Sequence, residues 1–227
     1  MAQIQPTDTV LNVGCNNGYM ERHLLRGLGA SCFGVDADPQ AIEFARRSGL
    51  SGLQDNVDAR TRFQCSPAEN LPFGDALFDK VLCLDTLEHV TNEKQALHEI
   101  HRVLKPGGTL VLSVPHDFMN FLDPDELTRG LRNVVRKVRN KKQLDHPRHR
   151  HYSEAQLREL LARFEVVNVH KCGTPVFWSL AMFYTAFGLP DKLTGPLRAV
   201  TNPIEDAEYA LALPTGFNIM VKACKPS

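Results

Sequence analysis

Small and acidic residues follow the first two apolar runs of the chain. The run Thr9–Gly14 leads into the sequence GCNNG, which ends at Gly18, and Asp36 closes the run Ser31–Asp36. Glycine lets a backbone turn tightly and lets a ligand approach it closely. The helix expected next offers free N–H groups to a carboxylate or phosphate. Asp36 comes 22 residues after Gly14, which suits a carboxylate that binds both hydroxyls of a ribose. The spacing predicts a nucleoside-type ligand.

The glycine pattern distinguishes between nucleotide ligands. The pattern G-x-G-x-x-G is typical of dinucleotide sites, and phosphate loops need G-K-[ST]. Here the run reads GCNNGY, so the later glycines of the first pattern are out of register and the second pattern is absent. A glycine turn or a strand-end acid alone is common in plain turns and helix caps, so the prediction rests on their combination. A turn with less glycine favours a ligand without a pyrophosphate.

Alternating strand-like and helix-like segments position these residues. Strands are expected at Thr9–Gly14, Ser31–Asp36, Arg62–Cys65, Phe78–Leu84, Thr109–Val114, Phe164–His170 and Gly216–Ala223. Helices are expected at Gly18–Leu28, Pro39–Arg47 (capped by Asp38), Asn92–Leu104 and Ser153–Phe164. Apolar strands between amphipathic helices predict an α/β fold with a doubly wound, mostly parallel, seven-stranded sheet. Ligands of such sheets bind outside the carboxyl ends of the strands.

Length and charge describe the rest of the chain. Its 227 residues predict a single domain, 1–227, with insertions at about 116–150 and 173–205 that form a substrate cap. The formal net charge is zero, which makes nucleic acid an unexpected partner. However, residues 129–150 contain nine Lys or Arg and one Asp, a net charge of +8, and the remaining 17 bases and 25 acids give −8. The zero is therefore a cancellation between two parts of the chain.

Cysteine usage and the N-terminus predict the compartment. Six cysteines are scattered without a C-x-x-C pair, which favours a reducing compartment and predicts no disulfide and no zinc site. The histidines in 146–151 lack a cysteine or acid cluster to complete a ligand set, so no metal is predicted. The N-terminus lacks a signal-peptide pattern, and the longest apolar stretch, 176–189, is too short to span a membrane. We expect a cytoplasmic protein, with a membrane-peripheral position as the alternative.

Four motifs in order resemble a known family. VLNVGCNNG, GVDADP, SPAENLPFGDALFDKVLCLDTLEHV and EIHRVLKPGGTLVLSVP look like the consecutive motifs of class I S-adenosylmethionine-dependent methyltransferases, type 11, the ubiquinone/menaquinone methyltransferase-like group. The likeness runs from about Thr9 to Pro115, and HYSEAQLRELLARFEVVNV resembles the family's later helix and strand. The resemblance implies S-adenosylmethionine as cofactor, S-adenosylhomocysteine as product and a small-molecule acceptor.

The resemblance also implies roles for individual residues. Backbone contact with the methionine part falls to Gly14, Cys15 and Gly18, the ribose hydroxyls to Asp36, and adenine contacts to Ala37 and Ala68. Leu84 and Asp85 are implied beside the methionine part and the substrate entrance, and His89 is a candidate to line the site.

The motifs depart from the family at three cofactor positions. Asn12 stands where the family usually has an acid, so the charge that helps to hold the ligand's ammonium is missing. Asn16 replaces the middle glycine, which requires a left-handed backbone there. Pro67 replaces an acid or serine that meets the adenine amino group, so either Glu69 substitutes or no side chain does. These departures keep open an alternative, a non-catalytic protein that binds S-adenosylmethionine; an NAD-dependent oxidoreductase is a more distant one.

The candidate residues for binding or activating the acceptor lie in or beside the insertions and at the end of the fifth expected strand. His116 is the first candidate for a general base and His151 the second, and Asp117 and Tyr152 are candidates to bind the substrate. The basic segment 129–150 predicts contact with phosphate or an anionic membrane surface. Together with the apolar segment 176–189, it suggests an acceptor that is hydrophobic or lipid-linked and anionic. The sequence leaves the acceptor atom and the oligomeric state open.

Overall fold

The computed structural model describes residues 3–22, 28–50, 61–117, 150–173 and 216–227. The chain divides into two compact units. Unit 1 comprises Met1–Val114, Ala155–Val169 and Met220–Ser227, and unit 2 comprises Pro115–Glu154 and His170–Ile219. Both expected insertions fall in unit 2, where residues 118–149 and 174–215 lie outside the described part of the chain. A single domain over 1–227 stays a prediction.

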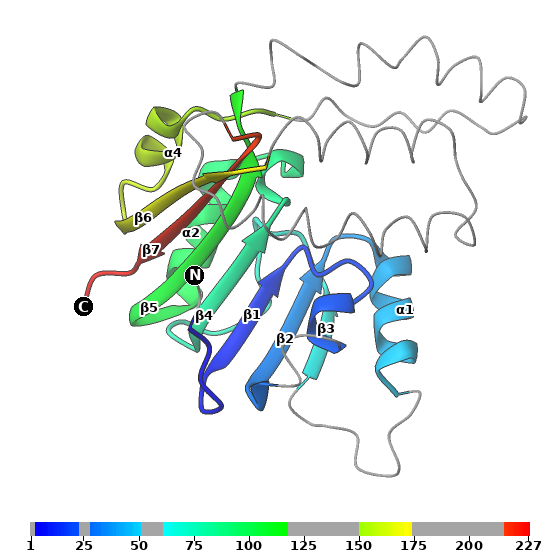
Figure 1. Ribbon diagram of the computed structural model, residues 1–227. Helices are drawn as coiled ribbons and strands as arrows, with labels where there is room; N and C mark the ends of the chain where they lie inside the picture. The colour runs from blue at the N-terminus through cyan, green and yellow to red at the C-terminus, as the bar shows by residue number, and fades with distance from the viewer. Residues whose placement is uncertain (1–2, 23–27, 51–60, 118–149, 174–215) are drawn as a thin grey trace, which may run out of the picture. The chain divides into compact units, whose positions relative to one another are not determined.

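Seven strands form one sheet, as the sequence predicts. The strands are β1 (Thr9–Val13), β2 (Ser31–Asp36), β3 (Thr61–Cys65), β4 (Phe78–Leu84), β5 (Leu104–Pro115), β6 (Glu165–Cys172) and β7 (Asn218–Cys224). Their order in the sheet is β3-β2-β1-β4-β5-β7-β6, which can be followed in Figure 1. The order reverses between β1 and β4, so the doubly wound arrangement is confirmed, and the carboxyl end of β1 lies at the position where such sheets bind ligands.

The sheet is parallel except at β7. β1 pairs in parallel with β2 and β4, β2 with β3, and β4 with β5. Backbone hydrogen bonds join Gly107 and Gly108, near the start of β5, to Lys225 just after β7. At the other end, the His116 N–H donates to the Phe217 carbonyl at 2.7 Å. The end of β7 therefore lies beside the start of β5, which makes β7 antiparallel in a mixed, mostly parallel sheet.

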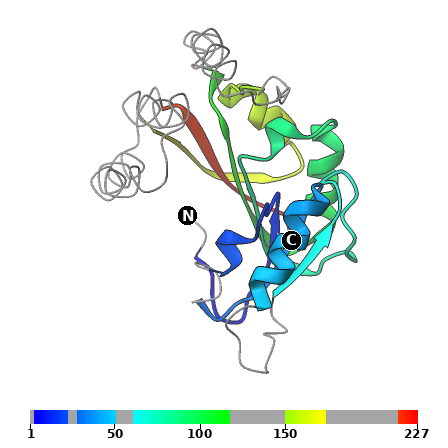
Figure 2. The ribbon, with the colours of Figure 1, turned by 90° about the vertical axis from the view of Figure 1, so that its right-hand side faces the viewer.

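Two helical segments follow the first two strands. Residues 19–22 form a helical turn after β1, and the remainder of the expected helix as far as residue 27 lies outside the described residues. Helix α1 (Pro39–Leu50) begins after Asp38, whose side chain accepts from the Gln40 N–H at 2.8 Å and so acts as the predicted N-cap. α1 packs against β2 and β3, at the edge of the sheet that faces the viewer in Figure 2.

Helix α2 (Glu93–Val103) and β5 meet without a loop. Asn92 caps α2 by accepting from the Gln95 N–H at 3.1 Å, and the apolar stripe of the helix is buried. The helix ends where Lys-Pro-Gly-Gly predicts, but β5 begins at Leu104, five residues earlier than expected. The reason is that this segment has strand partners, since Leu104 pairs with Phe78 and the two glycines bond to Lys225.

The C-terminal elements differ from prediction at their boundaries. Helix α4 (Glu154–Leu160) ends four residues before the expected Phe164. The chain continues there in tighter turns, in which the Phe164 N–H donates to Leu161 at 2.8 Å and the Ala162 N–H donates to Glu159 at 3.2 Å. Strand β7 begins two residues later than expected. Among the described residues, no helix is long and apolar enough to cross a membrane.

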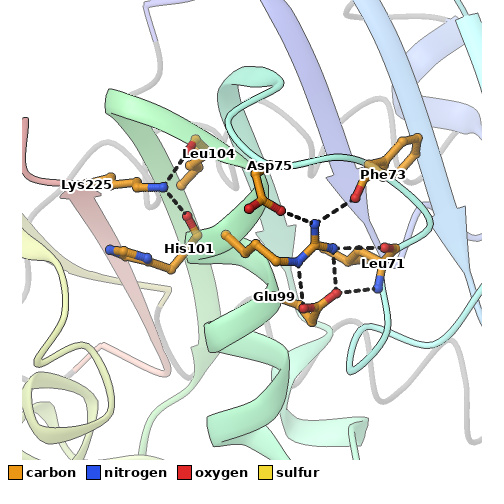
Figure 3. Close-up of polar contacts among 8 residues, drawn as sticks. Leu71, Phe73, Asp75, Glu99, His101, Leu104 and Lys225 are labelled. Carbon is orange, nitrogen blue, oxygen red and sulfur yellow. Dashed lines mark hydrogen bonds and ion pairs between the residues drawn. The ribbon is translucent and has the colours of Figure 1, made fainter.

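A group of polar contacts, here called the Arg102 network, fixes the β3–β4 loop to α2 (Figure 3). The Arg102 guanidinium donates to both carboxylate oxygens of Glu99, at 2.8 and 2.7 Å, and to Asp75 at 2.8 Å. It also donates to the carbonyls of Leu71 and Phe73, and Glu99 accepts from the Leu71 N–H at 2.9 Å. The loop that leads away from the carboxyl end of β3 is therefore anchored by paired charges.

Candidate functional site

The turn after β1 has a left-handed backbone at three positions. The φ angles of Gly14, Asn16 and Gly18 are +78°, +48° and +71°. A Cβ on Gly14 would lie 2.1 Å from Oγ1 of Thr86, so a larger residue does not fit without a rearrangement. Asparagine adopts this conformation more readily than most residues. Asn16 therefore keeps the turn that the family builds with glycine.

Asp36 is oriented by this turn at the end of β2. Its Oδ2 accepts from the Asn16 N–H at 2.8 Å and its Oδ1 accepts from the Asp38 N–H at 2.9 Å. The N–H groups of Gly14 and Cys15 both donate to the carbonyl of Val35, the residue before it. A carboxylate oxygen can accept two hydrogen bonds. Each oxygen of Asp36 thus keeps an acceptor position, which is the arrangement that two vicinal hydroxyls require.

The residues predicted around an adenine ring follow β2 and β3. Ala37 and Pro67 are exposed and Ala68 is buried. The Ser66 N–H donates to the Asp36 carbonyl at 2.9 Å, so the loop that carries Pro67 and Ala68 begins beside Asp36. The structure therefore brings these residues to the side of the turn on which Asp36 lies.

Glu69, in the same loop, has a partner within the protein. Its Oε1 accepts from the N–H groups of Thr91 and Asn92, at 2.8 and 3.1 Å. These two residues precede α2, so the Glu69 carboxylate joins the β3–β4 loop to the start of that helix. This contact accounts for one of the two carboxylate oxygens.

The end of β4 is tied to β5 by Asp85. This residue has a φ of +47°, its N–H donates to the Ser113 carbonyl at 3.0 Å, and its Oδ1 accepts from the Ser113 hydroxyl at 2.9 Å. Leu84, before it, is half-buried. The Thr86 hydroxyl donates within this end of the sheet, where the carbonyls of Val13 and Leu84 lie within reach. These contacts place Leu84 and Asp85 next to the Gly14 turn.

A short 3-10 helix, η3 (Leu87–His89), follows this strand and contains a buried acid. Glu88 is 4% exposed, and burial raises the pKa of its carboxyl to about 8, with a smaller contribution from Asp85. Its Oε2 has no hydrogen-bond partner among the described residues. The exposed His89 lies with Nε2 3.9 Å from Oε1 of Glu88. Sequence reasoning chose His89 here and missed Glu88.

A second buried acid, Glu21, lies beside Asn12. Asn12 is buried on β1, and its amide donates to Oε1 of Glu21 at 2.8 Å. Glu21 is 0% exposed, and its Oε2 has no partner among the residues that the structure describes. Burial is the largest cause that raises the pKa of this carboxyl, and the Asn12 hydrogen bond opposes it. Sequence reasoning missed Glu21, whose only signal is its spacing of three, four and seven residues from Leu24, Leu25 and Leu28, the expected apolar side of the helix.

In unit 2, the structure joins the predicted acceptor-side residues along two backbone segments. His116 and Tyr152 form a parallel β-bridge, and the Asp117 N–H donates to the Tyr152 carbonyl at 3.0 Å. Nδ1 of the buried His116 lies 2.9 Å from the Gly216 carbonyl, and Nε2 lies 3.3 Å from Oδ1 of Asp117. His151 is half-buried next to Tyr152. Within the described ranges, no group of His, Cys, Asp or Glu residues is placed to hold a metal ion.

The features in unit 1 define a class of ligand. Asp36 offers acceptors for a diol, the Gly14 turn allows close backbone approach, and Glu21 provides a buried acceptor beside that turn. This combination suits a nucleoside that carries a short polar chain with a cationic group. The residues present therefore fit an adenosyl amino acid.

Comparison with known proteins identifies the domain. Residues 11–112 match a family model described as "Methyltransferase domain". This match covers 102 of the 227 residues, and it agrees with the resemblance to the type 11 S-adenosylmethionine-dependent methyltransferases found in the sequence. S-adenosylmethionine is the cofactor that this family implies.

Individual relatives extend the match. The chain is 31% identical over 150 residues to a ubiquinone biosynthesis O-methyltransferase from Xanthomonas oryzae, covering 55% of this chain and 61% of that protein. It is 30% identical over 134 residues to a norajmaline N-methyltransferase from Rauvolfia serpentina, covering 57% of this chain and 43% of that protein. The chain thus spans less than two thirds of the length of either relative.

A solved structure confirms the fold over nearly the whole chain. An S-adenosylmethionine-dependent methyltransferase from Methanosarcina mazei superposes with a TM-score of 0.62 and 21% sequence identity. The superposition covers 98% of this chain and 94% of that one. The Rossmann-like methyltransferase fold is therefore shared beyond the residues of the family match.

Proposed function

We propose that the chain transfers a methyl group from S-adenosylmethionine to a small organic acceptor. The observation that carries this proposal is Asp36, held at the end of β2 by two backbone N–H groups and keeping one acceptor position on each oxygen. The close backbone approach at Gly14 and Asn16, and the positions of Ala37, Pro67, Ala68, Leu84 and Asp85 around the same strand ends, support it. Cys15 and Gly18 complete the turn.

The chemistry asks little of the protein beyond positioning. When bound, S-adenosylmethionine supplies a methyl group on a positively charged sulfur. The acceptor's lone pair forms the new bond to the methyl carbon, and the electron pair of the broken carbon–sulfur bond stays on sulfur. Holding the acceptor in line with that bond supplies much of the rate. A base is needed only where the acceptor atom carries a proton at neutral pH.

We propose His116 as that base. A carbonyl oxygen can only accept, so Nδ1 carries a proton that it donates to Gly216, which leaves the lone pair of the neutral ring on Nε2. If Nε2 took a proton from the acceptor, the resulting imidazolium of His116 would form an ion pair with Asp117. His151 is the second candidate for the base. Asp117, Tyr152 and His89 are proposed to contact the acceptor.

The acceptor is proposed to be hydrophobic or lipid-linked and anionic. This narrower proposal rests on the net charge of +8 in 129–150 and on the apolar segment 176–189, nearly all of which lie outside the described residues. The same basic segment is proposed to contact phosphate or an anionic membrane surface. One relative is named as an O-methyltransferase and another as an N-methyltransferase, so both oxygen and nitrogen acceptors should be tested.

The test begins with cofactor binding by the full chain. Titration calorimetry with S-adenosylhomocysteine should show binding by the wild type and a loss of about tenfold or more in Asp36→Asn. Asp38→Asn is the matched control and should bind normally, because asparagine also caps helices. Absence of binding by a folded wild type would contradict the proposed cofactor site.

The second step is an acceptor screen. Phenols and amines, each with and without an acid group and an apolar tail, are incubated with S-adenosylmethionine, and formation of S-adenosylhomocysteine is measured. Turnover with anionic, apolar phenols or amines above their neutral, short counterparts would support the narrower proposal. Cofactor binding without turnover on any of them would favour the non-catalytic alternative.

A further inference from the structure

Asn12 and Glu21 form a buried pair in which one acceptor is left over. Asn12 comes from β1 and Glu21 from the helical turn after it, and the 2.8 Å hydrogen bond between them uses only Oε1 of the carboxylate. Oε2 is buried and has no partner among the described residues. A carboxylate oxygen without a partner is costly inside a protein. Such a group calls for a donor that the described residues do not supply.

The pair lies next to the turn of the candidate cofactor site. Cys15 in that turn is buried, and after burial the charges of Glu21 and Asp36 are the next causes that raise the pKa of its thiol. The thiol is thus influenced by both carboxylates. Asp36 is the proposed ribose acceptor, so Glu21 provides a second acidic group beside the same five-residue turn.

Arg22, the cation nearest to Glu21 in sequence, contacts groups other than Oε2 of Glu21. Arg22 acts on Glu21 electrostatically and lowers the pKa of its carboxyl, but burial outweighs it. The Arg22 guanidinium donates to the Asn17 carbonyl and lies 5.8 Å from the centre of the Phe44 ring. Its contacts therefore lie with the turn and with α1, and Oε2 of Glu21 is left to another donor.

We infer that Glu21, held by Asn12, binds the ammonium group of the methionine part of S-adenosylmethionine through Oε2. This inference rests on the proposed function. An ammonium has three donors and a full positive charge, so it would satisfy the buried oxygen and compensate its charge. The bound cation would also lower the pKa of Glu21 and keep the carboxyl ionised.

The inference explains the unusual residue at position 12. The family usually has an acid there, and this chain has Asn12 hydrogen-bonded to an acid nine residues later. The two residues together still present one carboxylate and one neutral partner, with the charge moved from the strand to the helix. Asn12 is then a positioning residue, and Glu21 is the residue that contacts the cofactor.

The test compares two ligands that differ only in the amino acid part. S-adenosylhomocysteine carries the ammonium, and 5′-methylthioadenosine keeps the adenosine and the sulfur but lacks it. In titration calorimetry on the full chain, Glu21→Gln should weaken the first ligand about tenfold or more and leave the second within about twofold. Glu43→Gln on α1 is the matched control, since that exposed acid pairs with Arg47 at the surface, and it should change neither affinity.

A double variant separates charge from shape. Asn12→Asp combined with Glu21→Gln returns the acid to the strand and keeps an amide opposite it, so it should restore most of the S-adenosylhomocysteine affinity. Circular dichroism and thermal unfolding establish that each variant is folded. Equal loss of both ligands in Glu21→Gln, no loss at all, or no recovery in the double variant would overturn the inference. A wild type that binds neither ligand would instead contradict the proposed function.

Discussion

Two regions of unit 1 bury carboxylates in opposite ways. In the Arg102 network, Glu99 accepts three hydrogen bonds on its two carboxylate oxygens, and the guanidinium of Arg102 lowers its pKa.

 In Glu99, Oε1 accepts from Nε of Arg102, and Oε2 accepts from Nη2 of Arg102 and from the Leu71 N–H. At the strand ends, by contrast, Glu21 and Glu88 are as deeply buried, each leaves Oε2 without a partner among the described residues, and burial raises both pKa values.

We interpret this difference as one between charges that stabilise the fold and charges that are proposed to meet a ligand. A buried carboxylate costs free energy unless a cation or donors compensate it. The chain supplies that compensation away from the site, through Arg102. Beside the Gly14 turn and at η3 the described residues do not supply it, and those are the places where a bound cofactor and acceptor are proposed. Among the described residues, the uncompensated acids Glu21 and Glu88 therefore lie where the cofactor and the acceptor are proposed to bind.

The largest effect is expected from breaking the paired region. Arg102→Met removes the cation from a carboxylate whose side chain is only 10% exposed, and it removes the donors to Leu71 and Phe73. We expect the free energy of unfolding to fall by about 3–5 kcal/mol, measured by urea denaturation. Arg47→Met is the control, because its ion pair with Glu43 is exposed, and it should cost less than about 0.5 kcal/mol. Equal losses in the two variants would contradict the comparison.

The next effect is a pH dependence of stability that comes from Glu88. Its pKa is about 8 in the folded protein against an ordinary value of 4.5. A raised pKa means that the folded state holds the proton more tightly, so this contribution to stability is complete below pH 4.5 and is lost as the pH rises through about 8. Glu88→Gln should remove that loss, so its stability relative to the wild type should rise by about 4 kcal/mol between pH 5 and pH 9.

Glu99→Gln is the matched control for this pH series. The pKa of Glu99 is lowered, so its contribution is present above its ordinary pKa of 4.5 and is lost only as the pH falls below it. Between about pH 5 and pH 9 the destabilisation of Glu99→Gln should therefore be constant. Urea denaturation at several pH values measures both variants. A flat difference between Glu88→Gln and the wild type would show that Glu88 is compensated in solution.

Much of the fold could be predicted because its signals are local. Apolar runs indicate the seven strands, helical spacing indicates the helices between them, and Asp38 caps α1 as predicted. The early start of β5 could not be predicted, because Lys-Pro-Gly-Gly is a turn signal and its strand partner, Lys225, lies more than a hundred residues away. The end of α4 was also missed, since Leu161 and Phe164 keep the apolar spacing while the backbone tightens.

The candidate site divides in the same way. Gly14, Asn16 and Asp36 could be predicted because turn chemistry and strand ends are visible in the sequence. Glu21 and Glu88 could not be predicted, because what distinguishes them is that the described residues leave Oε2 of each carboxylate without a hydrogen-bond partner. The pairing of Asn12 with Glu21 joins a strand to a helical turn. The nine-residue separation of the two does not distinguish Glu21 from an exposed acid on a helix.

The smallest expected effect concerns Glu69, which belongs to neither extreme. Sequence reasoning placed it near the adenine ring, while its Oε1 accepts from the N–H groups of Thr91 and Asn92. We expect Glu69→Gln to lower the free energy of unfolding by about 0.5–1 kcal/mol, because a neutral acceptor replaces a charged one. Affinity for S-adenosylhomocysteine, measured by calorimetry, should stay within about twofold. If affinity falls instead while stability is unchanged, Glu69 belongs with the cofactor-binding acids. The β3–β4 loop would then contain ligand-binding as well as compensated carboxylates.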